Sequence, residues 1–199
     1  MARSFAPRTV MEAPAPARSE QWSDERLVTA CLDRDSEAWG VLIDRYKNLI
    51  YSIPVRLGLH QDANDIFQSV CLDLLQELQR LREAKALPQW LIQTCYHKCL
   101  ACRRRAERQV ELDTDELPHP TEVPKDLLAE LEQEQEVRDA VANLPDRCRR
   151  MVEMLFYEDP PRSYDEVAKE LNLATGSIGF IRGRCLQRMR KELEGMTKR

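Results

Sequence analysis

Three cysteines and a histidine stand close enough in the sequence to suggest a metal site. Cys95, Cys99 and Cys102 follow a C-x3-C-x2-C spacing, which radical enzymes use to hold an iron–sulfur cluster, and His97 lies between them. The cysteines fall on the apolar stripe of a predicted helix, however, whereas cluster ligands must converge on one point. Free cysteine is also a common small core residue. We therefore predict core packing, no bound metal and no cofactor, and keep a cluster-containing enzyme as an alternative.

The opposite face of the same predicted helix, which opens near Pro88 and runs to about Arg105, mixes aromatic and basic side chains. Six residues share this face: Trp90, Thr94, His97, Ala101, Arg104 and Arg105. Because aromatic rings can stack on unpaired bases and arginines can neutralise phosphates, the face fits partly single-stranded nucleic acid. In the alternative, Trp90 packs into the small core and the arginines are merely solvated.

A second predicted helix, from Ala63 to about Leu81, has one clear apolar stripe. That stripe comprises Ala63, Ile66, Phe67, Val70, Cys71, Leu74, Leu75 and Leu78. The opposite face comprises Asp65, Gln68, Ser69, Leu72 and Gln76. Because Leu72 points away from the core among hydrogen-bonding groups, this face suits a protein interface. The alternative is a solvated face with one stray leucine, since single exposed apolar residues are normal.

The C-terminal part of the chain has the pattern of a helix-turn-helix. Ser163 and Glu166 form a capping box, Asn172 can adopt the left-handed turn conformation, and a second helix begins near Thr175. The outer face of this second helix comprises Ser177, Phe180, Arg184, Gln187, Arg188 and Lys191. Such a mainly basic face is expected of a helix that enters the major groove of duplex DNA. The alternative is an ordinary helical hairpin with a basic surface.

The overall composition favours a small helical protein. The chain has 199 residues, of which 32% are charged, with only 6 glycines and 6% aromatic residues. This length excludes a large barrel enzyme. Seven cysteines, an odd number scattered through helix-like sequence, argue against a disulfide framework and for a reducing cytosol. Because no apolar run is long enough for a membrane span and the first 20 residues have no apolar signal core, we expect a soluble, cytoplasmic protein without membrane contact.

Charge divides the chain into segments. Twelve acidic and three basic residues lie between Glu107 and Asp139, whereas seven basic and two acidic residues lie between Gly176 and Arg199. We predict an all-α fold of two small helical domains joined by an acidic linker. The parts are a disordered, Pro- and Ala-rich tail (1–21), a first helical domain (22–106), the acidic linker (107–133) and a helix-turn-helix domain (134–199).

Two blocks of residues resemble the extracytoplasmic-function (ECF) sigma factors of bacterial RNA polymerase, which belong to the sigma-70 family. The first block resembles sigma region 2 and comprises Asp24-Glu25-Arg26-Leu27-Val28, Asp35, Ala38-Trp39, Ala63-Asn64-Asp65-Ile66-Phe67-Gln68, Trp90-Leu91 and Arg103 to Arg105. The second resembles sigma region 4 and comprises Leu144-Pro145, Arg149, Tyr164, Glu166-Val167-Ala168, Leu171, Gly176-Ser177-Ile178 and Arg184-Cys185. The resemblance covers roughly residues 23 to 194, and the blocks occur in the family's order without a region 3 between them.

The resemblance implies a dissociable specificity subunit, not an enzyme. Such a subunit binds core RNA polymerase, recognises promoter DNA and promotes its melting for transcription initiation. Its partners are the clamp helices of the largest polymerase subunit, the flap of the second, promoter DNA and, in many relatives, an anti-sigma protein. The acidic linker would run through the polymerase toward the RNA exit channel. A stand-alone helix-turn-helix regulator, which binds duplex DNA but not polymerase, is the alternative hypothesis.

The resemblance also assigns the three faces described above. The residues expected to bind polymerase are Asp65, Gln68 and Leu72. Those expected to bind the minus-ten element through region 2 are Trp90, His97, Arg104 and Arg105. Those expected to bind the minus-thirty-five element through region 4 are Ser177, Phe180, Arg184, Gln187, Arg188 and Lys191.

Overall fold

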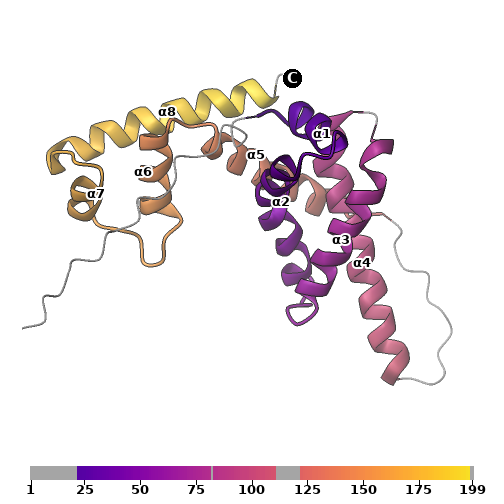
Figure 1. The fold of residues 1–199 in the computed structure, drawn as a ribbon. Helices are drawn as coiled ribbons and strands as arrows, with labels where there is room; N and C mark the ends of the chain where they lie inside the picture. The colour runs from indigo at the N-terminus through magenta and orange to yellow at the C-terminus, as the bar shows by residue number, and fades with distance from the viewer. Residues whose placement is uncertain (1–21, 82, 111–121, 198–199) are drawn as a thin grey trace, which may run out of the picture.

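The structure, a computed structural model, describes residues 22–81, 83–110 and 122–197, and these residues form helices joined by short turns. The α-helices are α1 (Asp24–Leu32), α2 (Ser36–Arg56), α3 (Ala63–Glu77), α4 (Leu87–Val110), α5 (Lys125–Ala142), α6 (Asp146–Phe156), α7 (Tyr164–Glu170) and α8 (Ile178–Thr197), as Figure 1 shows. Three 3-10 turns accompany them: η2 (Leu78–Arg80), η3 (Ala84–Ala86) and η4 (Thr175–Ser177). No strand occurs in the described part of the chain. The all-α prediction is therefore confirmed.

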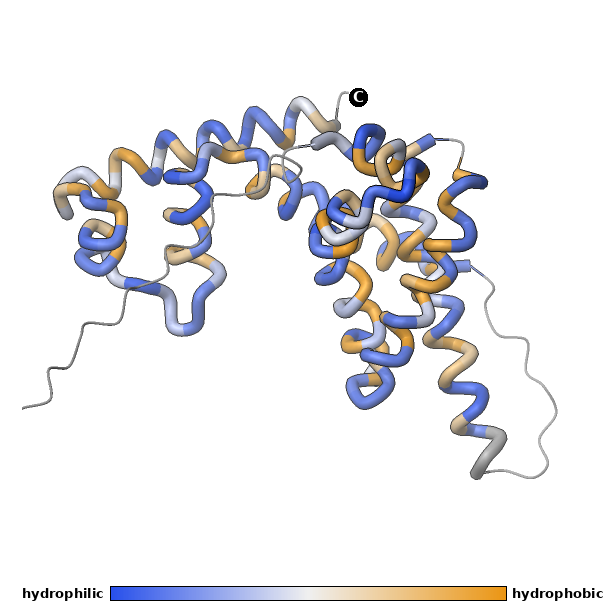
Figure 2. Tube along the Cα trace, in the orientation of Figure 1, coloured by the Kyte–Doolittle hydropathy of each residue, from blue (hydrophilic) through white to orange (hydrophobic). Residues whose placement is uncertain are grey.

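Helices α1 to α4 pack around a first core, and local sequence explains where they begin. The side-chain oxygen of Ser23 caps α1, and that of Asp35 accepts hydrogen bonds from two backbone N–H groups at the start of α2. Gly58, with φ of 78°, makes the turn between α2 and α3 in a conformation that favours glycine. Apolar and polar positions alternate along each helix, as Figure 2 shows, so each helix turns one face inward. Leu42 and Leu91 are among the fully buried side chains of this core.

A second, smaller core lies among α6, α7 and α8. It includes Met151, Val167 and Ile178, each fully buried. The capping box predicted at the start of α7 is present, because Ser163 and Glu166 each accept a hydrogen bond from the other's backbone N–H. The next turn contains Asn172 in the left-handed conformation predicted for it, with φ of 51°. The predicted second helix begins with η4 and continues as α8.

Helix α5 lies between the two groups of helices (Figure 1). It packs against α2 and α4 on one side and against α8 on the other. Leu131 is fully buried in the first core, although it lies in the segment predicted as an acidic linker. Helix α4 also extends to Val110, beyond the predicted end near Arg105. The predicted tail and residues 111–121 of the predicted linker lie outside the described residues, and the domain limits stay a prediction.

One disulfide bond corrects the expectation drawn from the seven cysteines. Cys148 of α6 is bonded to Cys185 of α8, with 5.3 Å between their Cα atoms. The five free cysteines are Cys31, Cys71, Cys95, Cys99 and Cys102. The bond was not predictable from spacing, because the partners are 37 residues apart and meet only where α6 and α8 pack together.

None of the described helices combines the length and the apolar character needed to cross a membrane.

Candidate protein-docking and nucleic-acid interfaces

Helix α3 is held in place by contacts on the sides that it turns toward α2 and α4. The ring of Phe67 stacks on Tyr51, with 4.5 Å between ring centroids, and the Tyr51 hydroxyl donates a hydrogen bond of 2.9 Å to Asn64 Oδ1. On the other side, Asp73 Oδ2 lies 2.7 Å from Lys98 Nζ of α4. These contacts fix the rotation of α3, so its remaining face is presented to solvent in one orientation.

The predicted docking residues lie together on that remaining face. Asp65 and Gln68 are exposed, and the side chain of neither makes a hydrogen bond or ion pair with another described residue. Leu72 is 60% exposed. At about 100° per residue, the three side chains fall within a narrow arc of the helix. The structure therefore brings together two free polar groups and an apolar side chain, a combination that a partner protein can bury.

Leu75 extends this face and corrects the predicted apolar stripe. The sequence pattern placed Leu75 on the core side of the helix, but the side chain is 57% exposed. It lies one turn from Leu72 and two turns from Gln68 along the helix surface. The actual core side of α3 is narrower, comprising Ala63, Ile66, Val70 and Leu74. Two adjacent leucines in solvent favour an interface over a single stray apolar residue.

The predicted nucleic-acid face of α4 follows the helix for about 21 Å, at 1.5 Å per residue from Trp90 to Arg104. His97 and Arg105 are exposed, and Arg104 is half-buried. Arg104 Nε is shielded from solvent without a hydrogen-bond partner among the described residues. Arg104 Nε is therefore not available to an external ligand, and any contact with a phosphate would have to come from the terminal nitrogens of the guanidinium.

The position of Trp90 agrees in part with each of the two interpretations of the sequence, an exposed stacking ring and a ring packed in the core. The side chain is half-buried and packs against the first core, so it is neither a free ring nor a fully internal residue. Because Trp90 lies in the first turns of α4, its ring stands at one end of the predicted nucleic-acid face. The buried part anchors the ring, and the exposed part stays available for stacking.

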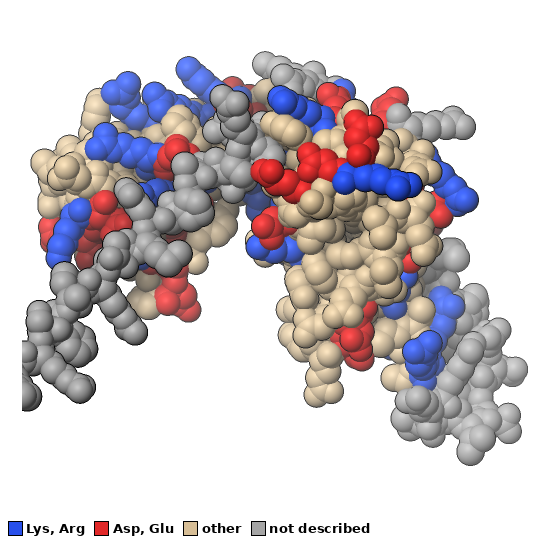
Figure 3. Space-filling model, in the orientation of Figure 1, with Lys and Arg blue, Asp and Glu red and all other residues tan. Residues whose placement is uncertain are grey.

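The outer face of α8 is exposed over most of its length. Phe180 is 71% exposed, and Gln187 and Lys191 are also exposed. The guanidinium carbon of Arg184 lies 5.8 Å from the centroid of the Phe180 ring, which keeps an aromatic and a basic group side by side. The predicted residues on this face span an arc of about 100° at the helical period. Figure 3 shows Lys and Arg side chains gathered along α8.

Ser177 differs from the other residues predicted on this face. It is half-buried at the end of η4, and its hydroxyl donates a hydrogen bond of 2.6 Å to the carbonyl of Ala174. The side chain therefore helps to start α8. The hydroxyl oxygen can still accept a hydrogen bond from a ligand, since a hydroxyl has acceptor as well as donor capacity.

The three cysteines of the candidate metal site do not converge. Cys95 and Cys99 are buried in the first core, and the Cys95 thiol donates a hydrogen bond of 3.4 Å to the carbonyl of Ile50. A hydrogen bond between the two thiols raises the pKa of Cys95 and lowers that of Cys99. Cys102 instead lies near Asp62. Among the described residues, no three His, Cys, Asp or Glu side chains are grouped so that they could hold a metal ion.

Three polar contacts that join α5 to α2 were not predicted from the sequence. The buried Gln135 donates hydrogen bonds from Nε2 to the carbonyl of Arg45 (3.4 Å) and to Asp139 Oδ1 (2.9 Å). Arg56 of α2 forms ion pairs with Glu130 (3.2 Å) and Glu134 of α5. The acidic composition of this segment concealed these contacts, because it resembled that of a solvated linker.

The described fold and surfaces define an all-helical protein with a small helix-turn-helix unit and two basic faces on separate helices. No family model matches the chain. The chain is 23% identical over 171 residues to the ECF RNA polymerase sigma-E factor of Haemophilus influenzae, and the match covers 80% of this chain and 89% of that protein. The resemblance to ECF sigma factors that the motifs predicted is thereby confirmed.

Proposed function

We propose that the chain acts as a sigma factor that binds core RNA polymerase, recognises promoter DNA and promotes its melting. The observation that carries this proposal is the similarity to an ECF sigma factor over 80% of the chain. Wherever a match of this length begins, it includes α3 and reaches into the second helical group. In this role the chain supplies binding surfaces in the cytoplasm, and its own residues catalyse no reaction.

The exposed face of α3 is the proposed docking site for the clamp helices of the largest polymerase subunit. Leu72 and Leu75 would supply the apolar area, and the unpaired Asp65 and Gln68 would supply directed hydrogen bonds. The helix is rigidly held by its contacts with α2 and α4, so little conformational freedom is lost when a partner covers the face. The flap of the second subunit is the proposed contact for the α6–α8 unit.

The basic faces of α4 and α8 are the proposed nucleic-acid surfaces. On α4, Trp90 would stack on an unpaired base of the minus-ten element while Arg104 and Arg105 neutralise phosphates. On α8, the early residues would reach base edges of the minus-thirty-five element and the later basic residues would contact phosphates. Binding of the minus-thirty-five element to α8 would hold the minus-ten element near α4. Because the α4 face accepts unpaired bases, this binding would favour the melted promoter.

The experiment that tests docking compares two double variants in binding to purified core polymerase. We expect Asp65→Ala with Gln68→Ala to weaken binding at least about tenfold, or about 1.4 kcal/mol. The matched control is Asp33→Ala with Gln89→Ala, which removes the same side-chain types from exposed positions outside α3. Equal binding by both double variants would count against docking through α3.

The experiment that tests promoter recognition is run-off transcription by the reconstituted holoenzyme on fragmented genomic DNA. Discrete transcripts that need this chain would support the proposal and identify the promoters. The salt dependence of DNA binding then tests α8: Arg188→Ala should reduce the slope of log affinity against log salt by about 1. Arg190→Ala is the matched control, because Arg190 lies off this face and is paired with Glu194 at 3.6 Å. Duplex-DNA binding without polymerase binding would favour a stand-alone regulator instead.

A further inference from the structure

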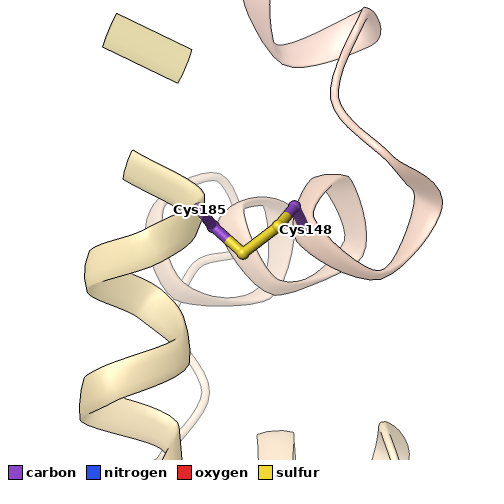
Figure 4. The surroundings of a disulfide bond; sticks show 2 residues. All are labelled: Cys148 and Cys185. Atoms are coloured by element: carbon purple, nitrogen blue, oxygen red, sulfur yellow. A yellow bond between two sulfur atoms is a disulfide. The ribbon is translucent and has the colours of Figure 1, made fainter. Parts of the chain in front are cut away.

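The disulfide bond between Cys148 and Cys185 joins two buried residues of the second core and bridges two helices (Figure 4). Cys148 lies in the first turn of α6 and is 6% exposed. Cys185 lies in α8 and is 1% exposed. Both residues face the same small core, so the bond links the helix that supports the unit to the helix that carries its basic face.

The disulfide closes a loop of the chain that contains α7, the turn and the start of α8. The chain between the two cysteines contains the rest of α6, all of α7, the turn at Asn172 and the first turns of α8. Cys185 also follows Arg184 directly, so the covalent link lies immediately behind the proposed DNA-binding face. The bond therefore constrains this unit directly, since both of its cysteines lie within it.

The other cysteines are placed differently. The five free cysteines all lie in the first helical group. Burial raises the pKa of Cys31 to about 11 and raises the pKa of Cys71 as well, so both thiols are weak nucleophiles at neutral pH. The pair in the second core is thus separated from them by position and by bonding state.

We propose that Cys148 and Cys185 form a thiol–disulfide exchange site that sets the rigidity of the helix-turn-helix unit. A thiolate of a dithiol reductant attacks Sγ of Cys148, which is the more exposed of the two residues, and the Cys185 sulfur leaves as a thiolate and takes up a proton. The second thiolate of the reductant then releases Cys148, and the reductant leaves as its own disulfide. The protein gains two electrons and two protons. A peroxide reverses the change, since it oxidises the two thiols to the disulfide and is reduced to water.

Opening the bond removes a constraint on the unfolded chain and leaves a small core to hold the unit. In the chain-entropy account, closing a loop of this length restricts the unfolded chain and so stabilises the folded, oxidised unit relative to the folded, reduced one. We expect reduction to lower the melting temperature of the α6–α8 unit by about 10 °C or more. We also expect faster hydrogen exchange in α7 and α8, because local opening there no longer has to stretch a closed loop.

The test uses the full chain and follows thiols and hydrogen exchange together, without DNA or polymerase. After mild treatment with hydrogen peroxide, alkylation of the denatured protein and mass spectrometry should find five free thiols and one linked peptide pair containing Cys148 and Cys185. Dithiothreitol applied to the native protein should raise the number of free thiols to seven and accelerate hydrogen exchange in α7 and α8. Removing the reductant and adding peroxide should restore the slow exchange.

Variants separate the exchange site from a general effect of reductant. In Cys148→Ala with Cys185→Ala, α7 and α8 should show the fast hydrogen exchange of the dithiothreitol-treated protein both with peroxide and with dithiothreitol. Cys31→Ala with Cys71→Ala should still change from slow to fast exchange when dithiothreitol is added. The comparison of oxidised and reduced unmodified protein decides the matter even where a variant does not fold. Seven free thiols after peroxide, a bond that resists dithiothreitol in the native protein, or bond opening without faster exchange would each overturn the proposal.

Discussion

Each of the two helical groups holds a proposed binding face in a fixed orientation, and the contacts that hold it differ between the groups. Among the described residues, the first core contains twenty-two buried residues and the second contains eleven. In the first group, α3 is fixed by packing on α2 and α4, and every cysteine is free. In the second, α8 rests on a core half that size and is linked to α6 by a disulfide.

The difference follows from how core size scales with chain length. A small unit buries too little apolar surface to offset its ordering entropy comfortably, so an additional constraint contributes a larger share of its stability. A larger core needs no such constraint, and a cysteine there serves as an ordinary small apolar residue, as Cys95 and Cys99 do. Cysteine therefore has a different role in each group, because the two cores differ in size.

Leu91→Ala should break the first core while leaving the second intact, and it has the largest expected effect. The side chain is fully buried, so its truncation should cost about 2–5 kcal/mol. Urea unfolding followed by tryptophan fluorescence measures this, because Trp22, Trp39 and Trp90 all pack against the first core. Hydrogen exchange in α6–α8 should stay unchanged. Equal destabilisation of both groups would show that α5 joins them into one cooperative unit.

Asp139→Asn should test how much the buried carboxyl group of α5, the helix that contacts both groups, contributes to stability. Desolvation, followed by repulsion from Asp24, raises the pKa of Asp139 to about 6, although hydrogen bonding by Gln135 and the charges of Arg45 and Arg138 lower it in part. An acid whose pKa is raised on folding stabilises the protein most at low pH. That contribution is lost as the pH rises from about 4, the ordinary value, through about 6.

The substitution should therefore stabilise the protein at pH 8 by up to about 3 kcal/mol, and by much less at pH 4. An asparagine can keep the hydrogen bond from Gln135 but carries no charge to desolvate. Thermal melts of the two proteins at several pH values measure the effect. Asp146→Asn is the control, because that side chain is 62% exposed and pairs with Arg149 within α6. A gain that does not depend on pH would contradict the assignment.

The helices and most of the exposed faces were predictable because they depend on local periodicity. The helix-turn-helix was predictable for the same reason, since its capping box and the turn at Asn172 are encoded within a few residues. Leu75 was assigned wrongly because the apolar pattern of α3 is wider than the surface that α2 and α4 cover. Periodicity indicates which residues share a face, but the neighbouring helices decide how much of that face is buried.

The contacts between distant segments were not predictable from the pattern. Leu131 lies among acidic residues, so its segment has the composition of a linker, yet it is buried in the first core. The partner of Cys148 could not be identified either, because any of six other cysteines is compatible with the sequence. Both features depend on how helices cross, which the local sequence does not specify.

Arg56→Ala should loosen the contact between α5 and the first group by a small, salt-dependent amount. The Arg56 side chain is 30% exposed and pairs with Glu130 and Glu134, which are more exposed, so water screens the interaction. We expect a loss of about 0.2–1 kcal/mol at low salt, and less at high salt. Urea unfolding at two salt concentrations measures it. Lys47→Ala removes an exposed pair with Asp44 within α2 and serves as the control. A loss that persists at high salt would show that packing of the arginine stem dominates.

Gly183→Ala should show separately how this position affects the stability of α8 and its proposed contact with DNA. A Cβ atom built at Gly183 meets no atom within 4 Å, so the protein itself does not require glycine there. Alanine should therefore stabilise the helix by about 0.5–1 kcal/mol. If the DNA backbone approaches α8 closely at this turn, the same methyl group should weaken duplex binding. Gly195→Ala, also in open space but near the C-terminal end of α8, should stabilise without changing DNA affinity. Unchanged affinity for both variants would mean that the close approach of DNA does not occur at Gly183, and that the glycine only lowers the stability of a unit already dependent on its disulfide.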